Sequence, residues 1–248
     1  MHNEPLHVPL GSPQTILDIG CGTGIITRHL GQKYSAAQVY GIDLSPVPKT
    51  SGLNPTNVTY IQGDVRQLLH TDPRLALGTA DFAFNRLLVL GMTDWPGYVR
   101  DVALLLKPGG WAEMQDYALE WYLHGQPCPQ SSWLGALAKA AAVKGWDLHC
   151  GRNIGGYMQA AGLVDVQLRE YRVPFGTWAV KERPETRRIG EHIVKEVGTL
   201  YWHAIPKMLG GMGYEEGEIE GFREEAMIEL APQEGKEVSY HVTNGRKQ

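Results

Sequence analysis

The stretch TILDIGCGTG, residues 15–24, decides the fold class of this 248-residue chain. Its first half is an apolar run typical of a buried strand, and a helical spacing of apolar residues follows to about Lys33. The glycines between them allow a tight turn and let a ligand approach the backbone closely. The stretch therefore predicts a strand, a ligand-binding turn and a helix, in that order.

The spacing of the glycines narrows the kind of ligand. They follow the pattern G-x-G-x-G, whereas dinucleotide-binding domains typically carry G-x-G-x-x-G. Asp18 stands two residues before Gly20, and an acid at that place suits a ligand with a cationic amino group and no pyrophosphate. A turn with a purely structural role is the alternative interpretation.

Polar residues at later strand ends are expected to join the same site. Asp43 ends the strand pattern QVYGIDLS, where its carboxylate can accept from a ribose diol or can simply cap a turn. Asp64 ends NVTYIQGD and can accept from an adenine amino group, with the N–H of Val65 beside the ring. Arg86 follows the fourth strand pattern, and it either completes the wall of the ligand pocket or is an ordinary solvated arginine. These positions form one constellation because ligands of open α/β sheets collect at the carboxyl ends of the strands.

The pattern of alternating strands and helices continues along the chain. Five strand patterns lie before Tyr117, a helix interrupted near Gly151 spans 131–162, and a sixth strand covers 163–173. Amphipathic helices then span 181–231, before a last strand pattern at 237–245. We predict a core at 1–180, a helical lid or substrate insertion at 181–231, and a final strand at 232–248 that returns to the core.

Composition excludes several classes of function. The net charge is −4 without a basic face, which disfavours nucleic acid and anionic membranes as partners. The three cysteines, Cys21, Cys128 and Cys150, show no zinc-type spacing, so we expect no metal and no disulfide framework. No apolar run approaches the roughly 18 residues of a membrane span, and no targeting signal stands out, so we expect a cytoplasmic protein.

Four motifs together resemble a known family. DIGCGTG, GIDLS, GDV and LLKPGGW match the successive motifs of class I S-adenosylmethionine-dependent methyltransferases over about residues 15–117. A narrower resemblance is to the fungal methyltransferase-like (TAM-domain) proteins of secondary metabolism, through GIDLSPVP, the pair Asp94-Trp95, EMQDY and PFGTW at 174–178. The resemblance implies an α/β, Rossmann-like, seven-stranded sheet with an antiparallel last strand and a helical insertion between the last two strands.

The resemblance also implies the cofactor and its contacts. We expect S-adenosylmethionine as cofactor, S-adenosylhomocysteine as product, and no metal. The expected cofactor-binding positions are Asp18, Gly20, Cys21, Gly22, Gly24, Asp43, Leu44, Asp64, Val65, Asn85 and Arg86. Relatives usually carry an N-terminal helical segment over the cofactor, whereas 14 residues precede Thr15 here. Either the helices of 181–231 and a homodimer partner close the pocket, or the site is more open.

Candidate catalytic residues follow from the chemistry of methyl transfer. Transfer from a sulfonium is an in-line displacement, so positioning does most of the work and a base is optional. If the acceptor is a hydroxyl, His149, His192 or His203 can take its proton, and Asp116 can face the acceptor from the fifth strand. Each also has an ordinary interpretation, as a surface or core histidine or as a loop acid. Aromatic residues concentrate after the fifth strand and suit a flat or terpenoid-like acceptor.

Three functions compete on this sequence. The first is methyl transfer to a small-molecule acceptor of a biosynthetic pathway. The second is a cyclase or pericyclase on the same scaffold, and the third is a regulatory protein that binds the cofactor without transferring methyl. Fold does not decide between them.

Overall fold

The computed structural model describes residues 6–48 and 54–248. Within them the chain forms two compact units. The first, here called the glycine-loop unit, holds the residues up to Asp116 together with Cys150–Arg169 and His241–Gln248. The second, the helical unit, holds Tyr117–His149 and Glu170–Tyr240.

The strands join in one sheet with the order β3-β2-β1-β4-β5-β8-β7, and β6 pairs with β5. The strands are β1 (Thr15–Ile19), β2 (Gln38–Asp43), β3 (Val58–Gln62), β4 (Ala80–Arg86), β5 (Leu106–Leu123), β6 (Gln126–Pro127), β7 (Leu163–Pro174) and β8 (Lys236–Lys247). The helices are α1 (Ile25–Lys33), α2 (Val65–Thr71), α3 (Trp95–Leu105), α4 (Ser132–Lys144), α5 (Cys150–Ala160), α6 (Arg187–Leu209) and α7 (Glu216–Glu229). Three short 3-10 helices, η1 (Pro73–Leu75), η2 (Trp178–Lys181) and η3 (Pro184–Thr186), lie between them.

Strand directions agree with the expected mixed sheet. Strands β1 to β5 pair in parallel from β3 at one end to β5. Strands β5 and β7 both start in the glycine-loop unit and finish in the helical unit, whereas β8 starts in the helical unit and finishes in the glycine-loop unit. Since β8 lies between β5 and β7, it runs antiparallel to both, as the sequence predicts for the last strand.

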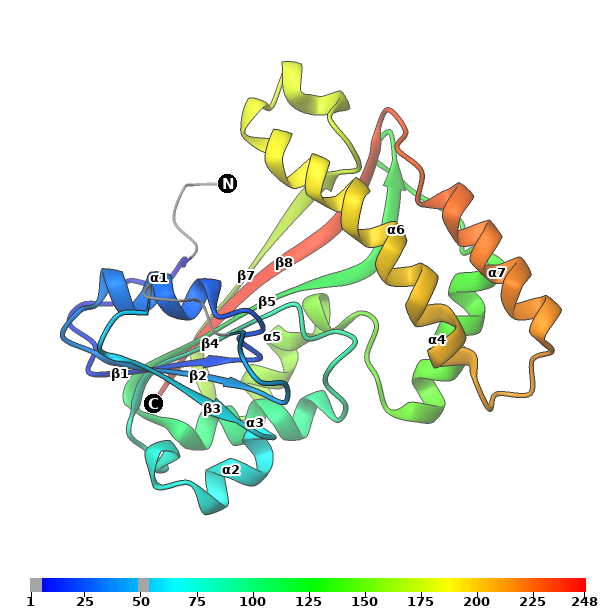
Figure 1. Ribbon diagram of the computed structural model, residues 1–248. Coiled ribbons are helices and arrows are strands. Elements are labelled where there is room, and N and C mark those ends of the chain that lie inside the picture. The colour runs from blue at the N-terminus through cyan, green and yellow to red at the C-terminus, as the bar shows by residue number, and fades with distance from the viewer. Residues whose placement is uncertain (1–5, 49–53) are drawn as a thin grey trace. The chain divides into compact units, whose positions relative to one another are not determined.

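The glycine-loop unit places its helices on both sides of the parallel strands, as the crossovers between parallel strands require. Figure 1 shows α1 on one side and α2, α3 and α5 on the other. The α1 side buries Ile16, Leu30, Val39 and Phe82 in one cluster that excludes water from the sheet.

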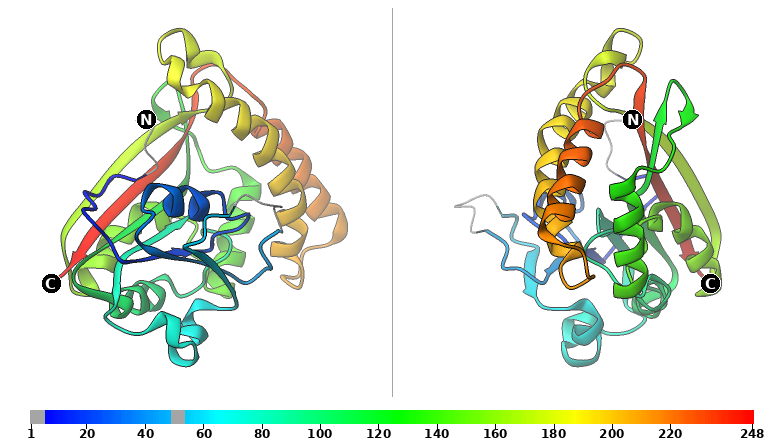
Figure 2. Two further views of the ribbon diagram at one scale, coloured as in Figure 1. Left: turned by 60° about the vertical axis from the view of Figure 1, so that its left-hand side comes forward. Right: turned by 90° about the vertical axis from the view of Figure 1, so that its right-hand side faces the viewer.

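Helices α4, α6 and α7 form the body of the helical unit and pack against one another. Both views in Figure 2 keep α6 and α7 side by side. Trp133 of α4 is fully buried and meets the ring of Tyr201 edge to face, with 5.3 Å between the ring centroids. Among the described residues, no helix is both long enough and apolar enough to cross a membrane.

Two predicted boundaries shift in the structure. The helix expected over 131–162 with an interruption near Gly151 is the pair α4 and α5, and the break lies at 145–149, because Gly145 takes the left-handed conformation (φ 75°) that ends α4. Gly151 lies inside α5. The fifth strand begins at Leu106, before the Pro108–Gly110 turn, and its pairing with β4 shifts register between Ala80 and Phe82.

The compact units have other bounds than 1–180, 181–231 and 232–248. The segment 181–231 shares its unit with residues 117–149, 170–180 and 232–240. The reason is that β5, β7 and β8 each contribute residues to both units, so that a cut at one chain position does not separate them.

The helical unit offers a test of its packing. Glu225 of α7 accepts hydrogen bonds from the N–H groups of Ser132 and Trp133 (3.1 and 3.2 Å) and from the Ser132 hydroxyl, and thereby caps the first turn of α4 from another helix. We expect Glu225→Ala to lower the free energy of unfolding by about 1–2 kcal/mol, the usual cost of a lost N-cap. Urea unfolding monitored by circular dichroism measures this change. Glu224→Ala, at the exposed neighbouring position, is the matched control, and equal stability of the two variants would contradict the capping role.

Candidate functional site

The glycine loop between β1 and α1 combines two tightly packed glycines with an open one. Gly20, Gly22 and Gly24 all have positive φ (70°, 54° and 72°), a region that other residues avoid. A Cβ on Gly20 would lie 2.3 Å from Leu88 Cδ2, and one on Gly24 would lie 2.5 Å from the Tyr60 hydroxyl. A Cβ on Gly22 would meet no described atom within 4 Å. The middle of the loop is therefore the place where a ligand can approach the backbone.

Hydrogen bonds tie this loop to the end of β2. The N–H groups of Gly20 and Cys21 both donate to the carbonyl oxygen of Ile42, at 2.7 and 3.1 Å. Asp43 accepts from Gly22 N through Oδ2 (2.8 Å) and from Ser45 N through Oδ1 (2.9 Å). An ionised carboxylate offers roughly four acceptor positions, so Asp43 can hold the loop and still accept from ligand hydroxyls.

Asp18 is the most unusual group of the site, since it is only 2% exposed. The Thr27 hydroxyl donates to its Oδ2 at 2.6 Å. Burial raises the pKa of Asp18 from 3.8 to about 6, while the Thr27 hydrogen bond and the charge of Arg86 partly lower it and Asp43 raises it further. A buried carboxylate with so little compensating charge suits a site that receives a cation.

The end of β3 brings the next expected residues to the same edge of the sheet. Gly63 N donates to the Asp43 carbonyl oxygen (2.8 Å), which joins the ends of β2 and β3. Asp64 is the N-cap of α2 and accepts from Arg66 N at 2.9 Å. Val65 is buried at the first helical position, where a backbone N–H has no partner within the helix, and Leu44 is 65% exposed.

The end of β4 carries Asn85 and Arg86. Ile19 of β1 pairs with Asn85, which places this end beside the glycine loop. Asn85 is 1% exposed and accepts from the Tyr98 hydroxyl at 3.1 Å. Over residues 6–48 and 54–248, its Nδ2 finds no hydrogen-bond partner. Arg86 is exposed, and its charge acts on Asp18.

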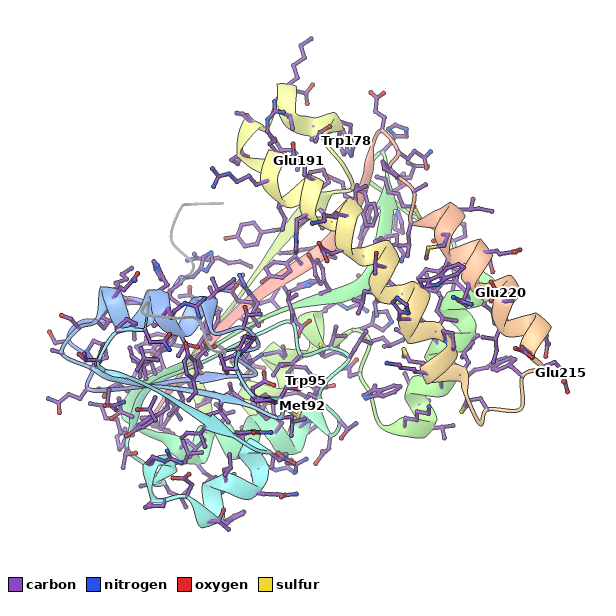
Figure 3. The ribbon with its side chains drawn as sticks, in the orientation of Figure 1. Met92, Trp95, Trp178, Glu191, Glu215 and Glu220 are labelled. Carbon is purple, nitrogen blue, oxygen red and sulfur yellow. The ribbon has the colours of Figure 1, made fainter. Side chains whose placement is uncertain are left out.

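Asp116 organises the loop that follows β4. It is fully buried, and its Oδ2 accepts from Leu88 N at 2.6 Å. Leu87 N donates to the Gln115 carbonyl oxygen (2.9 Å), and Leu87 has a positive φ of 60°. The side chain of Leu88 packs over Gly20, so Asp116 acts on the glycine loop through Leu88. The same loop leads to Met92 and to the buried Trp95 at the start of α3 (Figure 3).

The histidines predicted as bases belong to the helical unit. His149 has its Nδ1 3.6 Å from Glu120 Oε1, beyond hydrogen-bond length, and its side chain is 44% exposed. His192 and His203 are exposed on α6. Their catalytic role stays a prediction, as does that of Asp116. Across the described ranges, no group of three or more histidine, cysteine or acidic side chains is arranged to hold a metal ion.

Several residues of the site were missed in the sequence. Thr27 lies at the third position of α1, where its hydroxyl reaches Asp18, and the only signal is a hydroxyl residue just after the glycine loop. Leu88, from the loop after β4, and Tyr60, from β3, fill the space beside Gly20 and Gly24, respectively. Tyr98 approaches Asn85 from α3, and its spacing from β4 carries no signal.

The strand order and the strand-end acids define the class of the protein, which has the fold of class I methyltransferases. A family model described as a methyltransferase domain matches residues 5–168, and the chain belongs to this family.

Relatives and solved structures agree with this assignment. Methyltransferase pytC of Aspergillus terreus is 28% identical over 225 residues, which cover 86% of this chain and 66% of that protein. The secondary metabolism regulator LAE1 of Cochliobolus heterostrophus is 28% identical over 183 residues, 72% of this chain and 58% of that one. The phosphoethanolamine N-methyltransferase 2 structure from Haemonchus contortus shares the fold, with a TM-score of 0.53, 17% identity, and coverage of 96% of this chain and 50% of that chain. The chain thus spans about two thirds or less of the length of these relatives.

The buried Asp18 predicts a pH-dependent stability. Its pKa is higher in the folded protein than its usual value, so folding favours the protonated form, and stability falls as the pH rises from about 4 through 6. We expect Asp18→Asn, which removes this ionisation, to unfold with a free energy that exceeds the wild-type value by up to about 3 kcal/mol at pH 7, the equivalent of two pKa units. The two proteins should be nearly equal at pH 4.

Urea unfolding of the ligand-free wild type and of Asp18→Asn at pH 4, 5, 6 and 7 measures this difference. A difference that stays constant across the range would show that Asp18 is not the titrating group.

Proposed function

We propose that this chain binds S-adenosylmethionine at the ends of β1 to β4 and transfers its methyl group to a small-molecule acceptor. The observation that carries the proposal is the convergence of the glycine loop, Asp18 and Asp43 at one edge of the sheet, joined through Gly22 and Ile42. Membership of the methyltransferase-domain family supports it. Because the curated relatives are longer than this chain, the activity is proposed from the residues that are present.

Asp18 fits the amino group of the proposed cofactor. A charged carboxylate that is 2% exposed destabilises the ligand-free protein, and a cationic amino group beside it would offset that cost. The gain in affinity comes from an opposite charge in a site of low dielectric. Binding should therefore favour the ionised form of Asp18.

Asp43 and Gly22 fit the ribose. Asp43 stands at the end of β2 with both oxygens directed by backbone N–H groups, which holds the carboxylate in one orientation. Its remaining acceptor positions can take the two hydroxyls of a ribose diol. The open space over Gly22 would let the ribose approach the backbone, and any side chain there would fill it.

Asp64, Val65 and Leu44 fit the adenine ring. Asp64 uses one oxygen as the cap of α2, which leaves its second oxygen for an exocyclic amino group. Val65 offers a backbone N–H, and the exposed Leu44 offers apolar surface to one face of the ring.

When bound, the cofactor would supply a methyl group activated by its sulfonium, with S-adenosylhomocysteine as the product left after transfer to the acceptor's lone pair. The protein then contributes orientation and exclusion of water. We propose that Asp116 is a positioning residue, since its Oδ2 already holds Leu88 N. If the acceptor is a hydroxyl, we propose His149 or His203 of the helical unit as the base.

A second function is supported by relatives named as regulators. LAE1 is named a secondary metabolism regulator and is 28% identical to this chain, the same identity as pytC over a shorter match. A regulatory protein that binds the cofactor would use the same glycine loop. A steady release of S-adenosylhomocysteine in the presence of an acceptor separates the two functions.

Calorimetric titration with S-adenosylmethionine and S-adenosylhomocysteine tests the site. We expect binding of both by the wild-type protein, and a loss of affinity of at least about tenfold in Asp43→Ala, because two strong hydrogen bonds to the ribose would be lost. Glu182→Ala, an exposed acid of the helical unit, is the control and should bind like the wild type. Absence of binding by the wild type would refute the proposed function.

A panel of phenolic, carboxylic and terpenoid acceptors tests the transfer step by the release of S-adenosylhomocysteine. We expect at least one acceptor class to give turnover that the Asp43→Ala variant loses. Tight cofactor binding with no turnover on any class would favour the regulatory function.

A further inference from the structure

We propose that Thr27 is a positioning residue that holds the Asp18 carboxylate ionised, ready to receive the cationic amino group of the cofactor. This inference rests on the proposed function. It assigns a role to a residue of α1 that lies outside the glycine loop and outside the strand ends.

Thr27 is placed so that its hydroxyl, on α1, can donate a hydrogen bond to the Asp18 carboxylate. Thr27 is the third residue of α1, it is fully buried, and its Oγ1 donates to Asp18 Oδ2 at 2.6 Å. The N-cap, Gly24, has no side chain to cap the helix, and the first turn contains no acid. Asp18 therefore meets the positive end of α1 from the neighbouring strand, where the backbone N–H of Thr27 adds a second favourable interaction.

Without Thr27, little near Asp18 would favour its charge. Burial raises its pKa most, and among the described residues Arg86 of β4 is the one other group that lowers it by its charge, from an exposed position. Asp43 of β2 raises it. Burial, and after it the charge of Asp18 among other causes, raises the pKa of Cys21, of Tyr60 of β3 and of Tyr98 of α3, so these groups lie within the electrostatic reach of the carboxylate. The Thr27 hydroxyl is the largest favourable influence on the ionised form.

The consequence is a site whose affinity depends on pH. At a pH below about 6 the carboxyl is protonated and neutral, so a cationic ligand group gains little from it. A hydroxyl that donates to the carboxylate lowers the pH at which the carboxyl becomes protonated, which leaves the site charged at neutral pH. Loss of the hydroxyl should raise the pH at which Asp18 becomes protonated by about one unit, the equivalent of one strong hydrogen bond to a charged group.

The test compares three proteins: wild type, Thr27→Val, which has the same shape without the hydroxyl, and Thr27→Ser, which keeps it. The dissociation constant for S-adenosylhomocysteine is measured by calorimetry from pH 5 to pH 8.5. For the wild type we expect a plateau above about pH 6 and a steady weakening below. For Thr27→Val we expect the same plateau affinity at pH 8.5, a midpoint about one unit higher, and thus roughly fivefold weaker binding near pH 6 that approaches about tenfold at pH 5. Thr27→Ser should follow the wild type.

Other outcomes would overturn the proposal. A uniform loss of affinity in Thr27→Val, with an unchanged midpoint, would mean that the residue only supports packing. An unchanged curve would mean that the hydroxyl has no role.

A second measurement separates this proposal from the proposed function. The carboxyl ¹³C shift of Asp18 in the ligand-free proteins reports its titration directly, and its midpoint should rise in Thr27→Val. If the wild type binds ligand and that midpoint does not rise, the role of Thr27 is refuted while the function stands. If the midpoint rises and the wild type binds neither ligand, the proposed function is refuted, while the stabilisation of the ionised Asp18 by Thr27 stands.

Discussion

Two hydrogen bonds to one carbonyl oxygen organise the functional part of this molecule. Gly20 and Cys21 both donate to the oxygen of Ile42, so the chain leaving β1 is held against the end of β2 before it enters α1. The bonds require the left-handed turn that Gly20 and Gly22 provide, since a Cβ on Gly20 would collide with Leu88. The next donor, Gly22 N, then meets the Asp43 carboxylate. These hydrogen bonds thus join the glycine loop, Asp43 of β2 and the start of α1 in one hydrogen-bonded arrangement.

That arrangement creates an electrostatic conflict which α1 partly relieves. The turn leaves Asp18 under the helix, out of water, with Asp43 as a negatively charged neighbour. In the absence of a cationic ligand, a site that contains both acids is less stable than a site that lacks them. Such a loss of stability is common where a protein binds charged molecules. The cost is confined to Asp18, because Asp43 and Asp64 are partly exposed and engage backbone N–H groups.

Most of the fold and the strand-end residues could be predicted because their signals are local. The glycine spacing, the acids at strand ends and the apolar periodicity all lie within a few residues of one another, and the strand order follows from the family resemblance. The residue at which the helix breaks is less well defined by the sequence, since Gly145 and Gly151 both suit a helix end, and α4 ends at Gly145. Asp116 on Leu88, Tyr60 beside Gly24, and Glu225 at the start of α4 join residues 28, 36 and 93 positions apart, respectively, and no local pattern carries such pairs.

Sequence identity does not separate methyl transfer from regulation for this chain. The two relatives pytC and LAE1 are each 28% identical to this chain, over 86% and 72% of its length, and a shared fold does not decide between a methyltransferase and a regulator. The family model ends at residue 168, before α6, α7, β8 and the second half of β7. These later segments carry His192 and His203 and the aromatic residues Trp178, Tyr201 and Trp202, which suit an apolar acceptor. If the chain transfers methyl as proposed, residues 169–248 are therefore the part in which to seek contacts with the acceptor.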